Sequence, residues 1–281
     1  MLGVLPADNH VHSEWSWDAL GGSMMRSCAA AAALGLRAIA FTEHADFTRW
    51  TIPPQGVATM PAEFQAMIGD DGRFYAPAFD HAGYAESIER CRAAFPGLRI
   101  RSGVELGEPH WHADAARDLL ARYPFDRVVG SVHSLADRGV FAVVDRLYGT
   151  TEPHDVVRRY LTEVLRMVQD TGAFAILGHV DYPLRAWPQS AGTMAVAAFE
   201  EELRAVLTAL AGTGRIFELN TRLAEPFTLL RWWRDSGGRW LSFGSDAHGP
   251  AEVAHNFAVA KAMAEAAGFR PVDDQELWGL A

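Results

Sequence analysis

Residues 8–19 read DNHVHSEWSWDA and place two histidines, His10 and His12, at the end of a short apolar stretch. If that stretch is a β-strand, the two imidazoles point to the same face, because side chains alternate along a strand. Asp18 follows in the next few residues. Histidine and carboxylate groups on one face can share a metal ion, although an isolated His-x-His pattern also arises by chance. The rest of the chain has to separate these two interpretations.

The overall composition is typical of a soluble globular protein, with 281 residues, 49% hydrophobic and 21% charged. This length suffices for one barrel-sized domain or two smaller ones. The formal charge of -10 argues against a nucleic-acid partner, which needs clustered positive charge. No apolar run reaches the roughly 18 residues of a membrane span, and the N-terminus shows no signal-peptide pattern. Cys28 and Cys91 predict no disulfide framework, so we expect a cytoplasmic protein, of an oligomeric state that the sequence leaves open.

Strand-like and helix-like segments alternate along the chain. The predicted strands are residues 4–10, 37–42, 98–106, 127–132, 174–178, 215–220 and 240–244. The predicted helices, with apolar residues at three- and four-residue spacing, are residues 23–34, 82–94, 113–122, 153–171, 194–210, 226–235 and 251–267. Strand–helix units in series predict an α/β fold with a parallel sheet, most simply a closed barrel that forms a single domain over residues 1–281. Residues 45–80, rich in proline and glycine, are expected to be an irregular insertion, and such long loops are usually functional.

Side chains able to bind metal follow the ends of most of these strands. They are His10, His12, His44, Glu105, His133, His179, Asp246 and His248, and they include six of the eleven histidines. In a barrel, all strand carboxyl ends open on one face, so these residues should converge. Histidine with carboxylate is the ligand set of zinc, manganese and ferrous iron.

The remaining chemistry of the chain favours hydrolysis by metal-bound hydroxide. Two or three neighbouring ions can lower the pKa of a bridging water toward neutrality and hold the oxygens of an in-line displacement. The chain has no G-x-S-x-G motif, no Ser–His–Asp order and no catalytic cysteine setting. Lys261 is the only lysine, which excludes a Schiff-base or phosphate-loop lysine elsewhere.

Six short motifs occur in a fixed order: HVH at 10–12, TEH at 42–44, GVE at 103–105, SVH at 131–133, GHVD at 178–181 and SDAH at 245–248. This ordered set resembles the polymerase and histidinol phosphatase (PHP) superfamily over nearly the whole chain. Residues 81–108 and 123–135 look further like its histidinol-phosphate phosphatase branch. The resemblance implies a distorted (β/α)7 TIM-like barrel that holds two to three divalent ions, zinc, manganese or iron.

The same resemblance implies a ligand set. One ion would take His10, His12, Glu105 and Asp246; a second would take the bridging Glu105 with His133 and His179; a third would take Asp18, His44 and His248. Glu105, Asp246 and His248 would be the catalytic residues. The implied reaction is hydrolysis of L-histidinol phosphate to L-histidinol and phosphate by a metal-bridging hydroxide, with no nucleic-acid or membrane partner.

Substrate contacts are predicted from side chains near the strand ends. Arg185 and Arg222 are candidates to hold the phosphate, since arginine offers a bidentate fork; the alternative for each is a surface ion pair. Asn220 is a candidate to orient substrate or to cap a turn. Glu43 and Glu108 are expected at the rim, where they could contact a substrate ammonium.

Other aromatic residues and alternative functions complete the expectations. Trp15 and Trp17 either cover an imidazole-bearing substrate or pack beneath the rim, and the second His-x-His, His110 and His112, is interpreted as a rim or helix-start feature.

The same site could act on another small phosphate ester, such as a nucleotide or sugar phosphate. An amidohydrolase barrel also opens with His-x-His, but its binuclear members often use a carbamylated lysine, and Lys261 lies in the last predicted helix. A non-catalytic PHP module is disfavoured by the complete ligand set.

Overall fold

The computed structural model describes residues 4–222, 226–272 and 276–280. Its strands are β1 (Asp8–Val11), β2 (Ala38–Asp46), β3 (Trp50–Thr51), β4 (Arg73–Phe74), β5 (Arg99–Gly107), β6 (Arg127–Ser131), β7 (Ser134–Asp137), β8 (Val140–Val143), β9 (Ile176–Leu177), β10 (Ile216–Asn220), β11 (Trp240–Gly244), β12 (Phe269–Val272) and β13 (Leu277–Leu280). Its α-helices are α1 (Met24–Ala33), α2 (Pro54–Val57), α3 (Ala62–Gln65), α4 (His81–Ala94), α5 (Ala113–Arg122), α6 (Pro153–Asp170), α7 (Glu200–Thr213), α8 (Pro226–Asp235) and α9 (Phe257–Ala266).

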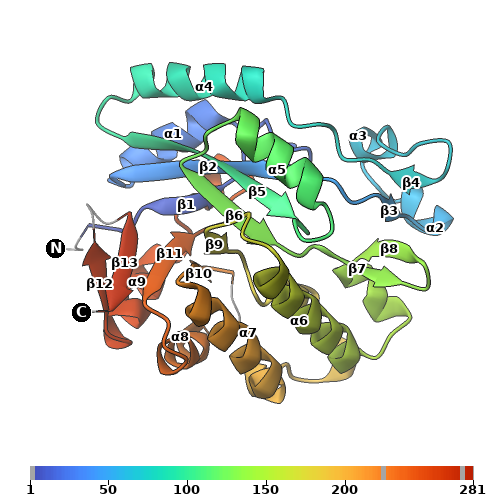
Figure 1. Ribbon diagram of the computed structural model, residues 1–281. Helices are drawn as coiled ribbons and strands as arrows, with labels where there is room; N and C mark the ends of the chain where they lie inside the picture. Colours follow the sequence, from blue (N-terminus) through green and yellow to red (C-terminus); the bar gives the residue numbers. More distant parts are fainter. Residues whose placement is uncertain (1–3, 223–225, 273–275, 281) are drawn as a thin grey trace.

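Parallel strands form a curled sheet in the order β1-β2-β5-β6-β9-β10-β11 (Figure 1). At their carboxyl ends the first and last strands meet, because the Asp246 N–H donates to the His10 carbonyl and the His12 N–H donates to the Ala247 carbonyl, both at 2.8 Å. At the amino ends, β13 pairs antiparallel with β11 and β12 adds to its other side. The barrel is therefore closed where the strands end and interrupted by a hairpin where they begin. The predicted class, a distorted TIM-like α/β barrel, is confirmed.

Burial on both faces explains how the sequence specifies these strands and helices. All nine residues of β2, AIAFTEHAD, are buried, as expected for a parallel strand covered by helices outside and by side chains inside. Helix α6 begins after Glu152, whose carboxylate accepts the N–H groups of His154 and Asp155. Its buried side is the apolar stripe Val157, Leu161, Val164 and Val168. Two other predicted helices begin late, α7 at Glu200 and α9 at Phe257, because a 3-10 turn precedes each.

A small second sheet lies beyond the carboxyl ends of β5 and β6, in the strand order β4-β3-β8-β7 (Figure 1). Two of its strands, β3 and β4, come from residues 47–80, and the same segment forms the one-turn helices α2 and α3. The prediction that residues 45–80 are irregular is therefore wrong in part: the segment is short strands and turns joined to the hairpin β7–β8 by the pairing of Trp50 with Phe141. Two-residue strands carry no periodic pattern that a sequence could reveal.

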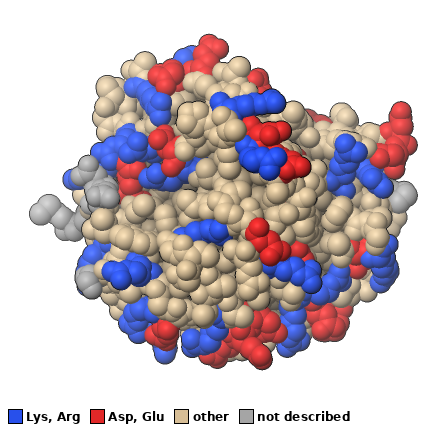
Figure 2. Space-filling view, viewed as in Figure 1, with Lys and Arg blue, Asp and Glu red and all other residues tan. Residues whose placement is uncertain are grey.

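On the face shown in Figure 2, acidic and basic side chains are interspersed. Among the helices of the described residues, none combines the length and apolarity needed to cross a bilayer.

Candidate metal centre

Glu105, near the end of β5, is fully buried among histidines. One of its oxygens, Oε2, lies 3.3 Å from His10 Nε2 and 3.4 Å from His12 Nε2. The other, Oε1, lies 2.9 Å from His179 Nε2 and 3.3 Å from His133 Nε2. Glu105 is thus shared by two groups of nitrogen atoms, one on each oxygen, which is the arrangement of a carboxylate that bridges two ions.

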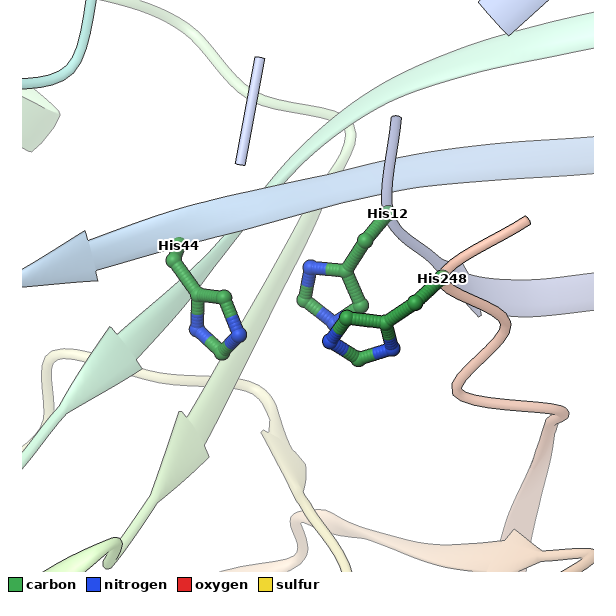
Figure 3. Close-up of side chains that lie close together, drawn as sticks. All are labelled: His12, His44 and His248. Carbon is green, nitrogen blue, oxygen red and sulfur yellow. The ribbon is translucent and has the colours of Figure 1, made fainter. Parts of the chain in front are cut away.

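A third group lies beside the first, toward the mouth of the barrel. Asp18 Oδ2 is 3.3 Å from His44 Nε2 and 3.1 Å from His248 Nε2. The ring of His12 lies against both, with centroid distances of 4.3 Å to His44 and 4.4 Å to His248 (Figure 3). His44 also connects the groups, since its Nδ1 lies 3.2 Å from Glu105 Oε2.

Asp246, in the loop after β11, completes the ring of ligand-type groups. Its Oδ1 lies 3.4 Å from His12 Nε2 and 3.8 Å from His10 Nε2. Its backbone is left-handed, with φ at 54°, and is held there by the hydrogen bond from its N–H to the His10 carbonyl. Left-handed backbone is uncommon outside glycine and clusters at functional sites. All nine residues expected to bind metal are therefore brought together at one end of the barrel.

The hydrogen bonds around the first two histidines indicate that this cluster suits a cation. His10 Nδ1 lies 2.6 Å from Glu218 Oε1, and His12 Nδ1 lies 2.9 Å from Ser16 Oγ. When both rings are neutral and donate from Nδ1, both Nε2 atoms carry lone pairs, and these atoms lie only 3.1 Å apart. Glu105 Oε2, directly beside them, accepts no hydrogen bond from any residue that the structure describes. A bound divalent ion would satisfy these facing lone pairs.

Without a cation, neighbouring carboxylates raise the pKa of His10, His44, His133 and His248, whereas burial lowers the pKa of His179. Burial alone would lower the pKa of His44, but the carboxylates of Asp18, Glu105 and Asp46 outweigh burial and raise it to about 10. Burial likewise opposes ionisation of Glu105, yet the imidazoles of His10 and His133 hold its pKa well below the ordinary value. The imidazoles with a raised pKa therefore hold a proton in the metal-free protein, and metal binding would release it.

Comparison with known proteins shows which family this chain belongs to. Residues 8–222 match the family model of the PHP domain. The chain belongs to the PHP family. The histidinol-phosphatase of Lactococcus lactis subsp. lactis (strain IL1403) is 28% identical over 274 residues, 93% of this chain and 91% of that protein. A Deinococcus radiodurans protein named "Probable histidinol-phosphatase" is 26% identical over 267 residues, 90% of each chain.

A solved structure agrees with the fold of this PHP protein. The crystal structure of histidinol phosphate phosphatase from L. lactis, complexed with zinc, L-histidinol and phosphate, matches with a TM-score of 0.77 at 24% identity. The match covers 98% of this chain and 99% of that chain. The resemblance expected from the six ordered motifs is confirmed.

A cavity of about 150 Å³ opens beside the metal centre of this PHP barrel. Its lining includes the expected catalytic residues Glu105, Asp246 and His248, and Arg185 from the 3-10 helix after β9. Arg185 Nη1 donates to Asp246 Oδ2 at 2.6 Å. Its Nε and Nη2 are buried and have no hydrogen-bond partner among the described residues. Arg185 therefore lines the cavity next to the metal centre and has two donors that no described residue uses.

The other two predicted substrate contacts do not reach the cavity. Arg222 Nη2 instead donates to Glu252 Oε2 at 2.7 Å, in a partly exposed ion pair. Asn220 is fully buried; its Oδ1 accepts the Arg222 N–H and its Nδ2 donates to Glu218 Oε2. The structure favours the alternative given for each residue: Arg222 forms a surface ion pair, and Asn220 caps the turn after β10 and also donates to Glu218.

The two acids expected at the rim are also buried. Glu43 accepts hydrogen bonds from the N–H and hydroxyl of Ser13 and from the Ser16 hydroxyl. It thereby fixes Ser16, the residue that holds His12. Glu108 Oε1 accepts the N–H groups of His133 and the residue after it, and so shapes the loop that follows β6. Their expected position at the rim is wrong, since both side chains are fully buried.

The tryptophans and the second His-x-His motif are now placed as well. Trp17 lines the cavity and donates from Nε1 to Asp46 Oδ2 at 2.9 Å. Trp15 packs against Gly83 of α4. His110 Nε2 pairs with Glu163 at 2.8 Å. His112 lies 2.9 Å from Thr48 Oγ1, and neither histidine lines the cavity.

Proposed function

We propose that this protein is a metal-dependent phosphomonoesterase that hydrolyses L-histidinol phosphate to L-histidinol and phosphate. The observation that carries the proposal is the shared position of Glu105, with facing imidazole nitrogens on both oxygens and the free donors of Arg185 nearby. The substrate is supported by the relatives, which are named histidinol-phosphatases and match almost end to end. It is supported further by the L-histidinol and phosphate in the L. lactis structure.

The residues that would hold the ions follow from the groups described above. They are His10, His12, Glu105 and Asp246 for one ion, Glu105, His133 and His179 for a second, and Asp18, His44 and His248 for a third. Divalent ions such as zinc, manganese or iron supply an activated water and positive charge for phosphoryl oxygens.

Other side chains that line the cavity would bind the phosphate and the alcohol part of the substrate. Arg185 would donate to phosphate oxygens from Nε and Nη2, while its bond to Asp246 fixes its orientation. Trp17, Trp50 and Tyr182 form the aromatic part of the wall, which suits the flat imidazole of the alcohol. Cys28 and Cys91 are free thiols, which fits the cytoplasm as the proposed location.

The test is a panel of phosphomonoesters offered to zinc- or manganese-reconstituted protein, with phosphate release as the readout. The panel holds L-histidinol phosphate, p-nitrophenyl phosphate, a nucleoside monophosphate and a sugar phosphate. We expect kcat/KM for L-histidinol phosphate to exceed that of every other ester by at least about 100-fold, the discrimination that a few buried polar contacts provide. Equal rates on all esters would reject the histidinol assignment, and no hydrolysis of any ester by metal-loaded protein would reject the phosphatase.

A further inference from the structure

Glu218 lies in the middle of β10 and is buried, with 1% of its surface exposed. Its carboxylate accepts hydrogen bonds from His10 and His179, which belong to two different metal-binding groups. Its Oε1 lies 2.6 Å from His10 Nδ1, on the ring edge opposite the metal centre. Its Oε2 accepts the backbone N–H of His179 at 2.7 Å and the side-chain amide of Asn220 at 3.3 Å.

We propose that Glu218 is a positioning residue that sets the ligands of two adjacent ions at once: the ring of His10 for one and the backbone of His179 for the other. The inference rests on the proposed metal centre and adds a residue that contacts no ion itself. A carboxylate behind a ligand histidine fixes the ring orientation and its tautomer. Here the same carboxylate also fixes the strand end that carries a second ligand.

This contact helps to hold the backbone of His179, because β9 is very short; on the other side of the residue, the His179 carbonyl accepts the Tyr160 hydroxyl at 3.1 Å and the Tyr182 N–H at 3.0 Å. The sheet bonds of β9 stop at Gly178, whose N–H donates to the Gly130 carbonyl. The next N–H, that of His179, has no strand to donate to and uses Glu218 instead. The Nδ1 of the His179 ring has no hydrogen-bond partner among the described residues, so its ring is oriented through its backbone and through Glu105.

Only a carboxylate suits this place. Three donors converge on the two oxygens of Glu218, from His10, His179 and Asn220. Glutamine has the same shape but one oxygen, so its amide N–H2 would face either the His179 N–H or the His10 Nδ1. In the second case His10 could accept only by moving its proton to Nε2, the atom that faces the metal centre. In a fully buried place no water relieves such a contact, and an unsatisfied donor there is costly.

A glycine in the neighbouring strand β11 leaves space for the contact between Glu218 and His10. Gly244 lies at the end of β11, next to β10 in the sheet. A Cβ atom at Gly244 would lie 2.2 Å from Glu218 Oε1 and 2.7 Å from His10 Cβ, closer than real Cβ contacts come. Alanine at this position must therefore push Glu218 away from His10 while every charge of the site is kept. Gly244→Ala tests the geometry, and Glu218→Gln tests the chemistry.

The experiment measures zinc affinity without substrate, by competition with a chromogenic chelator, in wild type, Glu218→Gln and Gly244→Ala. The matched control is Glu163→Gln: Glu163 also pairs with a histidine, His110 at 2.8 Å, but away from the cavity. The absorption spectrum of cobalt-substituted protein reports ligand geometry in each variant, and thermal unfolding of the metal-free proteins reports folding.

We expect zinc Kd to rise about 10- to 100-fold in both test variants, the range seen when an outer partner of a ligand histidine is removed. The cobalt bands should shift, and Glu163→Gln should stay within about twofold of wild type. Wild-type zinc affinity and an unchanged cobalt spectrum in folded Glu218→Gln would overturn the inference, whether or not Gly244→Ala folds. A wild type that binds zinc but hydrolyses no phosphoester would reject the proposed function alone, because none of these readouts uses substrate.

Discussion

Arg185→Met removes the guanidinium that faces the cavity beside Asp246. In the structure this group donates one hydrogen bond to Asp246 and keeps two buried donors, Nε and Nη2, without a partner among the described residues. If phosphate oxygens take both donors, the variant loses two charge-assisted hydrogen bonds, each about 1.5–3 kcal/mol. The sum, about 3–6 kcal/mol, corresponds to a loss of about 10²- to 10⁴-fold in kcat/KM at 1.4 kcal/mol per decade.

Arg185→Lys keeps the charge but loses the planar fork, so we expect a smaller loss of about 10- to 100-fold. The assay is steady-state phosphate release from L-histidinol phosphate and from p-nitrophenyl phosphate at saturating zinc, with metal content measured for each variant. The loss should be similar for both esters, since Arg185 would contact the part that they share. The control is Arg222→Ala, which removes an arginine paired with Glu252 outside the cavity and should change kcat/KM by less than about twofold. Arg185→Met with near-wild-type kcat/KM and full metal content would refute the reasoning, as would an equal loss in Arg222→Ala.

Four further predictions concern the metal centre. Glu105→Gln should lower kcat by about 10²- to 10³-fold or more, the loss typical of removing one group that organises charge in a transition state; a variant with full metal content and unchanged turnover would contradict a bridging role. Metal analysis after reconstitution should find two to three ions per chain, and a trace amount would contradict the centre. In metal-free protein the pKa of His44 is raised from 6.5 to about 10, so zinc must displace its proton below about pH 10. Zinc binding should release protons at pH 8 and weaken as pH falls, which calorimetry in two buffers of different ionisation enthalpy measures; heats independent of the buffer would argue against it. By the same shift, His44 stabilises the metal-free fold fully below about pH 6.5, and this contribution is lost as pH rises toward 10, which denaturant unfolding across that range measures.

The positions of the metal ligands could be predicted because they follow from one rule of parallel barrels. Each ligand except Asp18, which lies in the loop after β1, stands near the carboxyl end of a strand, and those ends share one face. His10 and Glu105 are 95 positions apart in the sequence numbering, yet the rule places them together and the structure has them 3.3 Å apart. This prediction does not need the exact ends of the strands, so it holds although β1 and β9 are short.

The residues that hydrogen-bond to the ligand histidines could not be predicted in the same way. Glu218 and His10 lie 208 positions apart and meet across the barrel interior, a contact that depends on the register of neighbouring strands. Glu43 could have been placed more accurately, because it neighbours His44 on a strand and adjacent side chains point to opposite faces. The sequence also treats Arg185 and Arg222 alike, since both follow strand ends. Only the folded chain reveals that Glu252, from another loop, pairs with Arg222.

A zinc-edge anomalous difference map from crystals grown with zinc, phosphate and L-histidinol would test the proposed metal centre. We expect two to three zinc peaks at the carboxyl end of the barrel, two of them on either oxygen of Glu105, with phosphate between the ions and Arg185. Zinc-loaded crystals without a peak in contact with Glu105, or with phosphate bound away from this cavity, would contradict it.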